Sequence, residues 1–348
     1  MSDTSRSTVF GDISGGVTTA VISLPMALTF GIVSGAGAIA GLYGAIIVGL
    51  FAALFGGTRT LISEPTGPMT VTMTAVITGT MAANPEQGLA LAFTVVMLAG
   101  LFQIAFGSLK LGRYITLMPY SVVSGFMSGI GVLLIVTQLA PLLGQASPAG
   151  GAIGTLRAIP DLVSGVRLPE VALSVLSLAI LFLIPRKARR FAPPPLVAVV
   201  VGTLVALAFF SDAGTRTIGR IPMGLPRLVM PRLTGALFAD LIVDALILAV
   251  LGSIDSLLTS MIADSLTREH HDSNRELVGQ GIGNLLSGLF GGLPGAGATM
   301  GTVVNIRSGG RTSRAGIIRA LVLLAIVLVV APLLESIPMA VLAAIAVK

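Results

Sequence analysis

The chain has 348 residues, of which 54% are apolar and only 10% are charged, and its mean hydropathy is +0.98. This composition excludes an ordinary water-soluble domain. The absence of cysteine excludes disulfides, zinc–thiolate sites and thiol nucleophiles. The net charge of +6 does not predict a nucleic-acid partner, because the basic residues lie between apolar runs, where membrane topology accounts for them.

The apolar runs, taken in chain order, predict membrane-spanning helices. They are continuously apolar, whereas the strands of a transmembrane barrel alternate apolar and polar residues, so we expect an all-α polytopic membrane protein. Residues 144–168 and 211–236 are rich in Gly, Pro, Ser and Thr and are expected to be outer loops. The chain ends inside the last apolar run, which indicates a truncated transporter. The expected segments are 13–34, 38–56, 66–82, 88–108, 118–143, 169–185, 193–210, 237–263, 277–291, 298–306, 316–334 and 337–347.

Basic residues predict how these segments are oriented. We expect a multi-pass protein of the cell inner (plasma) membrane with a cytoplasmic N-terminus. The cluster at 186–190 is interpreted as a stop signal at a helix end rather than as a lipid-head-group site. The expected outer bases are Arg157, Arg167, Arg216, Arg220, Arg227 and Arg232. The expected inner bases are Arg6, Arg59, Lys110, Arg113, Arg186, Lys187, Arg189, Arg190, Arg268, Arg275, Arg307, Arg311, Arg314 and Arg319.

Two predicted segments, the third and the tenth, are interrupted where a membrane helix should begin. Residues 55–70 and 290–302 each contain Phe-Gly-Gly, then a stretch with Pro and Gly, then small Thr-rich residues. Hydrocarbon tolerates such broken backbones only where they line a cavity. Paired interruptions predict a transporter site built on an inverted repeat of seven segments, with two half-helix N-termini facing a small anion. The alternative is that the glycines merely allow close helix packing.

Asp255 lies deep in the eighth segment, roughly 20 Å along the helix. An ionisable residue at that depth is costly and is a functional hypothesis by default. Thr259, four residues on, shares its helix face. With carbonyl groups freed by a broken helix, the two predict an all-oxygen site for a hard cation. The alternative, a buried aspartate paired to a backbone donor or a base, is weakened because the segment contains no base.

Other ionisable residues carry less weight. Asp240 and Asp244 lie near the outer end of the eighth segment and are expected to be hydrated. Glu64 could gate anions, but a capping or loop role at the inner face is favoured. His270 and His271 are expected to be solvated loop residues rather than metal ligands. No hydrolase, metalloprotease or phosphate-loop motif occurs, so we do not expect an enzyme.

The sequence resembles the SulP family of inorganic anion transporters, and within it the BicA-type sodium-dependent bicarbonate transporters of cyanobacteria. The resemblance covers nearly the whole chain. It rests on Gly-Leu-Tyr at 41–43, Phe-Gly-Gly-Thr at 55–58, Ser-Glu-Pro-Thr-Gly-Pro-Met-Thr at 63–70, the run from Asp255 to Thr267, Gly-Gln-Gly-Ile-Gly-Asn at 279–284 and Gly-Ala-Thr-Met-Gly-Thr at 297–302.

The resemblance implies a fold of seven plus seven inverted segments, here truncated. A core part would occupy about 10–110 and 235–335, and a gate part about 111–210 and 336–348. The anion would bind between Thr66, Gly67, Ala298 and Thr299, and sodium, the coupling ion, would bind at Asp255, Thr259, Thr299 and Gly301. Family members usually continue into a cytoplasmic STAS domain, absent from this chain, and form homodimers through it.

The implied function is sodium-coupled uptake of bicarbonate across the lipid bilayer by a secondary active transporter. Two alternatives remain open. One is a sulfate or dicarboxylate permease of the same family, with proton coupling as an option. The other, of a different class, is an anion channel, which would not need a cation at Asp255.

Overall fold

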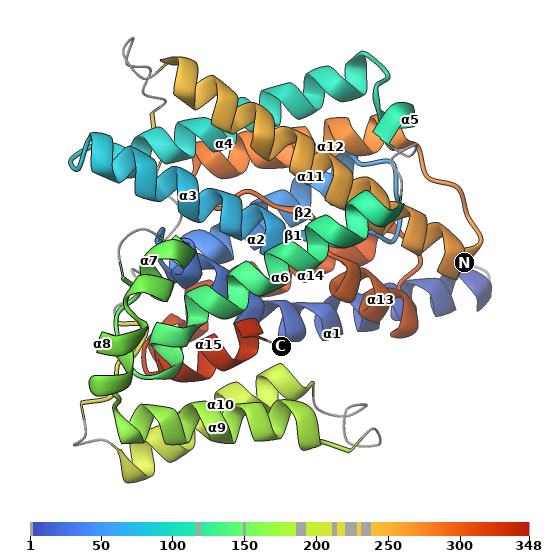
Figure 1. Cartoon of the computed structure of the whole chain (residues 1–348). Helices are drawn as coiled ribbons and strands as arrows, with labels where there is room; N and C mark the ends of the chain where they lie inside the picture. The colour runs from blue at the N-terminus through green and yellow to red at the C-terminus, as the bar shows by residue number, and fades with distance from the viewer. Residues whose placement is uncertain are drawn as a thin grey trace.

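The computed structural model describes residues 3–115, 120–148, 151–185, 193–210, 214–219, 228–230 and 238–347. Within these residues, helices surround one two-stranded sheet (Figure 1). The longer helices are α1 (Asp3–Val33), α2 (Ala38–Phe55), α3 (Gly67–Ala83), α4 (Gly88–Ser108), α6 (Tyr120–Leu142), α9 (Leu168–Leu183), α10 (Pro194–Phe209), α11 (Phe238–Thr267), α12 (Ser273–Leu289), α13 (Thr299–Arg307), α14 (Ser313–Leu334) and α15 (Met339–Val347). The short ones are α5 (Gly112–Ile115), α7 (Gly151–Arg157) and α8 (Ile159–Ser164).

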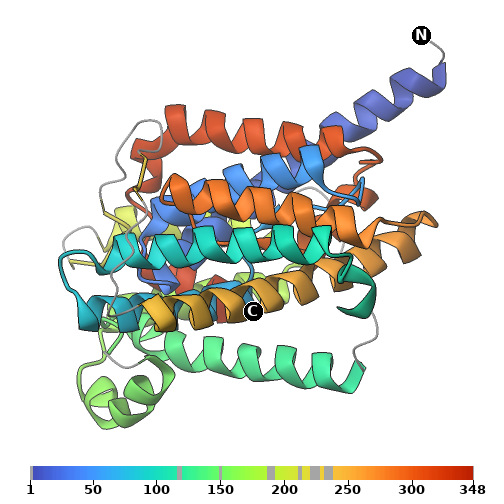
Figure 2. The same cartoon turned by 90° about the horizontal axis from the view of Figure 1, so that it is seen from above.

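Each predicted membrane segment corresponds to one of the longer helices. Within the described residues, α1, α2, α4 and α11 contain stretches long and apolar enough to cross a membrane by themselves. The main difference at a boundary is α1, which begins at Asp3 and projects beyond the bundle at its N-terminal end (Figure 2). The expected loop at 144–168 is wrong in part, because α7 and α8 occupy it. Most of 211–236, and the basic cluster at 186–190, lie outside the described residues.

Local chemistry explains several helix ends. Asp272 caps α12, since its carboxylate accepts hydrogen bonds from the amides of Asn274 and Arg275 at 3.0 and 3.1 Å. The Thr312 hydroxyl accepts from the Arg314 amide at the start of α14, at 3.3 Å. Between α1 and α2 the chain turns at Gly37, whose φ of 94° is readily adopted only by glycine.

The sheet lies inside the bundle and consists of β1 (Ser63–Glu64) and β2 (Ala296–Gly297), which pair antiparallel (Figure 1). β1 comes just before α3, and β2 comes just before α13. The two interrupted segments of the sequence are therefore neighbours at the centre of the molecule.

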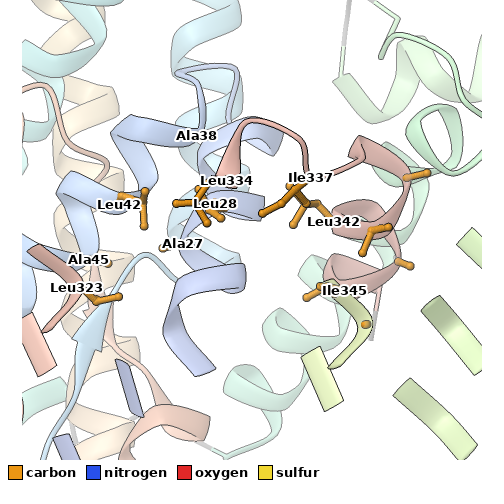
Figure 3. Close-up of a cluster of buried hydrophobic side chains, with 14 of the residues drawn as sticks. Ala27, Leu28, Ala38, Leu42, Ala45, Leu323, Leu334, Ile337, Leu342 and Ile345 are labelled. Atoms are coloured by element: carbon orange, nitrogen blue, oxygen red, sulfur yellow. The ribbon is translucent and has the colours of Figure 1, made fainter. Parts of the chain in front are cut away.

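Apolar packing joins the two ends of the chain. Figure 3 shows Leu28 of α1 and Leu42 of α2 in one cluster with Leu334 of α14 and Leu342 of α15. All four side chains are buried. A second apolar cluster is built mainly from α3, α4 and α11 around Met69. Helix α15 therefore packs on α1 mainly by burying apolar surface.

We expected one set of basic residues on the inner side of the membrane. Most of those that the structure describes are exposed near helix ends, among them Lys110, Arg268 and Arg307. These ends of α4, α11 and α13 lie on the same side of the bundle as the N-terminus (Figure 1). Arg319 is different, because it lies within α14 and is 0% exposed. Its assignment to the cytoplasmic set is wrong.

Candidate functional site

The two interrupted segments satisfy part of each other's backbone. Ser63 lies opposite Gly297 in the sheet. Just beyond, the Ala298 amide donates to the Ile62 carbonyl at 2.8 Å, and the Ile62 amide donates to Thr302 Oγ1 at 3.0 Å. The sequence predicted a shared cavity but not this pairing, because no local signal links residues that are 240 positions apart.

Two helix N-termini face the centre without a side-chain cap. In α3 the first amide to bond along the helix is that of Thr70, which donates to the Thr66 carbonyl at 2.9 Å. In α13 it is that of Thr302, which donates to the Ala298 carbonyl at 2.9 Å. The amides ahead of these have no acceptor within their own helix. Neither Thr66 nor Ala298 makes a capping hydrogen bond with its side chain. Such N-termini are favourable positions for an anion.

A cavity of about 240 Å³ lies between these N-termini. All four expected anion ligands line it: Thr66, Gly67, Ala298 and Thr299. Of the further residues expected to bind sodium, Asp255 and Gly301 line the cavity, whereas Thr259 lies behind it and is fully buried. At roughly 30 Å³ per water molecule, the space holds a small anion with several waters. Helix α1 supplies an apolar wall of Ile22, Met26 and Phe30.

Asp255 is buried, with 5% of its surface exposed. Its Oδ2 accepts a hydrogen bond from Thr66 Oγ1 at 2.7 Å. This contact explains why Thr66, a good capping residue by type, leaves the N-terminus of α3 uncovered. In the part of the chain that the structure describes, no Lys or Arg forms an ion pair with Asp255. A buried carboxylate is costly unless a cation balances it.

Thr259, an expected sodium ligand, contacts the chain segment at the start of α13 that carries two of the expected anion ligands. Its Oγ1 donates to the Gly297 carbonyl at 2.8 Å and lies 2.9 Å from Thr299 Oγ1. Gly301 has little space around it, since an added Cβ would lie 3.2 Å from Glu64 Oε1. The carboxylate, hydroxyl and carbonyl oxygens near Asp255 are the ligand types that hold sodium in broken-helix transporters.

Glu64 belongs to β1 and is buried, so the prediction that it caps a helix or lies in a loop at the inner face is wrong. It forms an ion pair with Nη2 of Arg319, which comes from α14. The carboxylate therefore lines the cavity with its charge already balanced by a base.

Arg319 was missed as a residue of the site. Besides Glu64 it binds Ser23 Oγ at 3.0 Å and the carbonyls of Ala45 and Ser63, each at 3.1 Å. The planar guanidinium thus joins α1, α2 and β1 to α14. The rule that singled out Asp255, an ionisable residue inside an apolar segment, applies equally to this arginine and could have found it.

The remaining candidates lie away from the cavity. Asp240 is exposed and Asp244 is half-buried. His270 is exposed as expected, but the His271 side chain is only 7% exposed, and its Nδ1 lies 2.7 Å from Asp264 Oδ2. Among the described residues, no group of three or more His, Cys, Asp or Glu could hold a metal ion.

The pattern of the sulfate permease family matches residues 9–348. The chain belongs to this family. Two proteins named bicarbonate transporter BicA, from Synechocystis sp. and Picosynechococcus sp., are 63% and 61% identical to it over 97% of its length. The solved transmembrane domain of a cyanobacterial bicarbonate transporter BicA is 60% identical, with a TM-score of 0.96, and the match covers 98% of this chain and 87% of that one.

Family membership confirms the SulP resemblance and a multi-pass membrane transporter fold, and it sets the chain apart from enzymes. The chain spans 60% of the length of each of the two BicA relatives.

Proposed function

We propose that the chain forms the membrane-embedded part of a secondary transporter that takes up bicarbonate together with sodium. The observation that carries this proposal is the pair of uncapped N-termini, of α3 and α13, which share one cavity with Asp255. Their free backbone amides would donate hydrogen bonds to the oxygen atoms of the anion, because the Thr66 hydroxyl already donates to Asp255. Identity above 60% to proteins named for bicarbonate supports this choice of anion.

The charge balance of the cavity favours a monovalent anion. Arg319, which lies outside the lining, neutralises Glu64, and within the described residues the lining contains no Lys or Arg to offset Asp255. Each helix N-terminus contributes roughly half a positive charge. With one sodium ion beside Asp255, the two N-termini then balance one negative charge. Sulfate would leave about one unit of negative charge uncompensated.

Sodium is favoured over a proton because of the groups around Asp255. The hydroxyls of Thr66, Thr259 and Thr299 and the Gly297 carbonyl form a polar, oxygen-rich surrounding. A carboxylate that works by protonation gains instead from apolar surroundings. An anion channel would have no use for a buried acidic residue at this position.

Most described exposed bases lie at one end of the bundle, whereas Arg157 and Arg167 belong to the expected outer connections, and this excess supports an inner-membrane protein with the more basic end in the cytoplasm. We also propose that α1–α4 and α11–α14 form a core part and that α6, α9, α10 and α15 form a gate part. Dimer formation would belong to the full-length protein.

Uptake of radiolabelled anion into proteoliposomes tests the proposal with the full-length protein. We expect rapid bicarbonate uptake when sodium is outside, little when choline replaces sodium, and little sulfate uptake under either condition. Equal uptake in choline with an imposed proton gradient would favour the proton-coupled alternative. Preferential sulfate uptake would contradict the choice of anion.

A further inference from the structure

Two more cavities lie beside the central one, between α1 and α3 on one side and α6 and α15 on the other. Their volumes are about 100 and 250 Å³. Both are lined by Ile32, Val33, Gln138 and Ser147, so they are neighbours. The smaller is also lined by Arg216, and no Asp or Glu among the described residues lines either cavity.

These cavities lie close to the central site along α1. Met26 and Phe30 line the central cavity, whereas Thr29, Ile32 and Val33 line the outer ones. From Met26 to Val33 the helix rises by roughly 10 Å, at 1.5 Å per residue. The predicted topology puts this end of the molecule outside. An anion on its way to the central site would therefore pass near Arg216.

The backbone of Arg216 is firmly held. Its amide donates to Glu170 Oε1 at 3.1 Å, and its carbonyl accepts from the Met339 amide at 2.8 Å. The next contact is from the Ile218 amide to the Ile337 carbonyl at 3.0 Å. None of these hydrogen bonds involves the guanidinium. Replacing the Arg216 side chain therefore leaves the backbone hydrogen bonds that hold this segment in place.

The charges around the smaller cavity favour an anion. The Glu170 carboxylate accepts a hydrogen bond from the backbone amide of Arg216. Nη1 of Arg167 lies 3.9 Å from Glu170 Oε1. Two arginines against one glutamate leave an excess of positive charge. A guanidinium presents paired N–H donors that match the oxygens of a planar oxyanion, and the hydroxyls of Thr29 and Ser147 add polar groups to the lining.

We propose that Arg216 and the lining of the smaller cavity form an outer recruitment site for small inorganic oxyanions, which then pass to the central site. This rests on the proposed function. A half-buried charge at an entrance concentrates anions and raises their association rate, and ions in solution weaken the effect. The site should therefore affect KM far more than the maximal rate.

The test compares Arg216→Gln with Arg167→Gln in the full-length protein, reconstituted in liposomes with the anion that the wild type transports. The second change removes the same charge beside the same glutamate, but Arg167 lines neither cavity. We expect Arg216→Gln to raise KM on the order of tenfold at low ionic strength, with the maximal rate kept and most of the salt dependence of KM lost. Arg167→Gln should raise KM much less than Arg216→Gln, because Arg167 lines neither cavity. Arg216→Lys should fall between the wild type and Arg216→Gln, because it keeps the charge but loses the paired donors.

Chemical rescue separates charge from structure. The chain has no cysteine of its own, so Arg216→Cys can be modified with a positively charged or a neutral methanethiosulfonate reagent, with treated wild type as control. We expect only the positive reagent to restore the low KM. Unchanged KM and salt dependence in Arg216→Gln, an equal shift in Arg167→Gln, or rescue by the neutral reagent would each overturn the recruitment site. Wild-type protein that transports neither bicarbonate nor sulfate would overturn the proposed function and this inference with it.

Discussion

Asp255 and Glu64 line the same cavity, yet their charges are balanced in different ways. Glu64 has a permanent partner in Arg319. Asp255 has the Thr66 hydroxyl, which is a hydrogen-bond donor without charge. The free energy of a charged Asp255 therefore depends on whether a cation is bound, whereas that of Glu64 does not. This difference is why we assign coupling to Asp255 and a structural role to Glu64.

Replacing Asp255 by Asn should remove sodium-dependent uptake, because the amide keeps the shape of the side chain but cannot balance a cation. The measurement is initial anion uptake against external sodium. In the wild type the apparent sodium affinity should rise with anion concentration, since coupling between two sites is reciprocal. Asp244→Asn is the matched control on the same helix, because Asp244 does not line the cavity. Sodium-stimulated uptake that survives in Asp255→Asn would contradict the assignment.

The paired strands and half-helices show what the sequence can and cannot predict. Long apolar runs gave the helices, and the Pro and Gly residues near 65 and 294 marked the two interruptions, because hydropathy and backbone restrictions are local properties. The pairing of Ser63 with Gly297 depends on how distant segments meet. No periodicity within either segment encodes it.

Side-chain partners across the bundle were harder to predict than helices. Arg319 follows Arg311 and Arg314, so it continues what reads as a basic cluster at a helix start. Its partner Glu64 lies 255 positions away in sequence. The use of the Thr66 hydroxyl by Asp255 is a similar case, because Thr before a helix ordinarily predicts a cap. The roles of these residues in binding stay predictions.

The ion pair between Glu64 and Arg319 should be important for stability. Arg319→Gln leaves the carboxylate buried without its base, which we expect to cost about 3–5 kcal/mol. Adding Glu64→Gln should recover part of the loss, because the double variant buries no unpaired charge. Thermal unfolding of the detergent-solubilised protein measures both effects. Equal unfolding temperatures for Arg319→Gln and the wild type, or a double variant less stable than the single one, would argue against this account.

Side-chain hydrogen bonds and apolar contacts are distributed unequally over the molecule. Side-chain hydrogen bonds tie the proposed core part together, four of them with lengths of 2.6–2.9 Å. Between α1 and α15 the packing is apolar. The hydrogen bond from the Thr29 hydroxyl to the Leu342 carbonyl is long, at 3.5 Å. Directional bonds resist displacement, whereas apolar surfaces can slide with little loss of buried area. Four examples that each join two core segments are Thr58–Ser260, Asn305–Thr60, Asn284–Gln103 and Gln280–Ser63.

This distribution predicts that the core part moves as one body against the gate part during transport. Cysteine pairs can test it cleanly, because the chain has none of its own. Thr58→Cys with Ser260→Cys joins two core elements whose hydroxyl oxygens lie 2.8 Å apart, and cross-linking there should leave uptake intact. Thr29→Cys with Ala343→Cys joins α1 to α15 across a shared cavity, and cross-linking with a short thiol reagent should stop uptake until a reductant is added. If both cross-linked proteins transported at the wild-type rate, α1 and α15 would not move relative to each other, and the access route would have to open elsewhere.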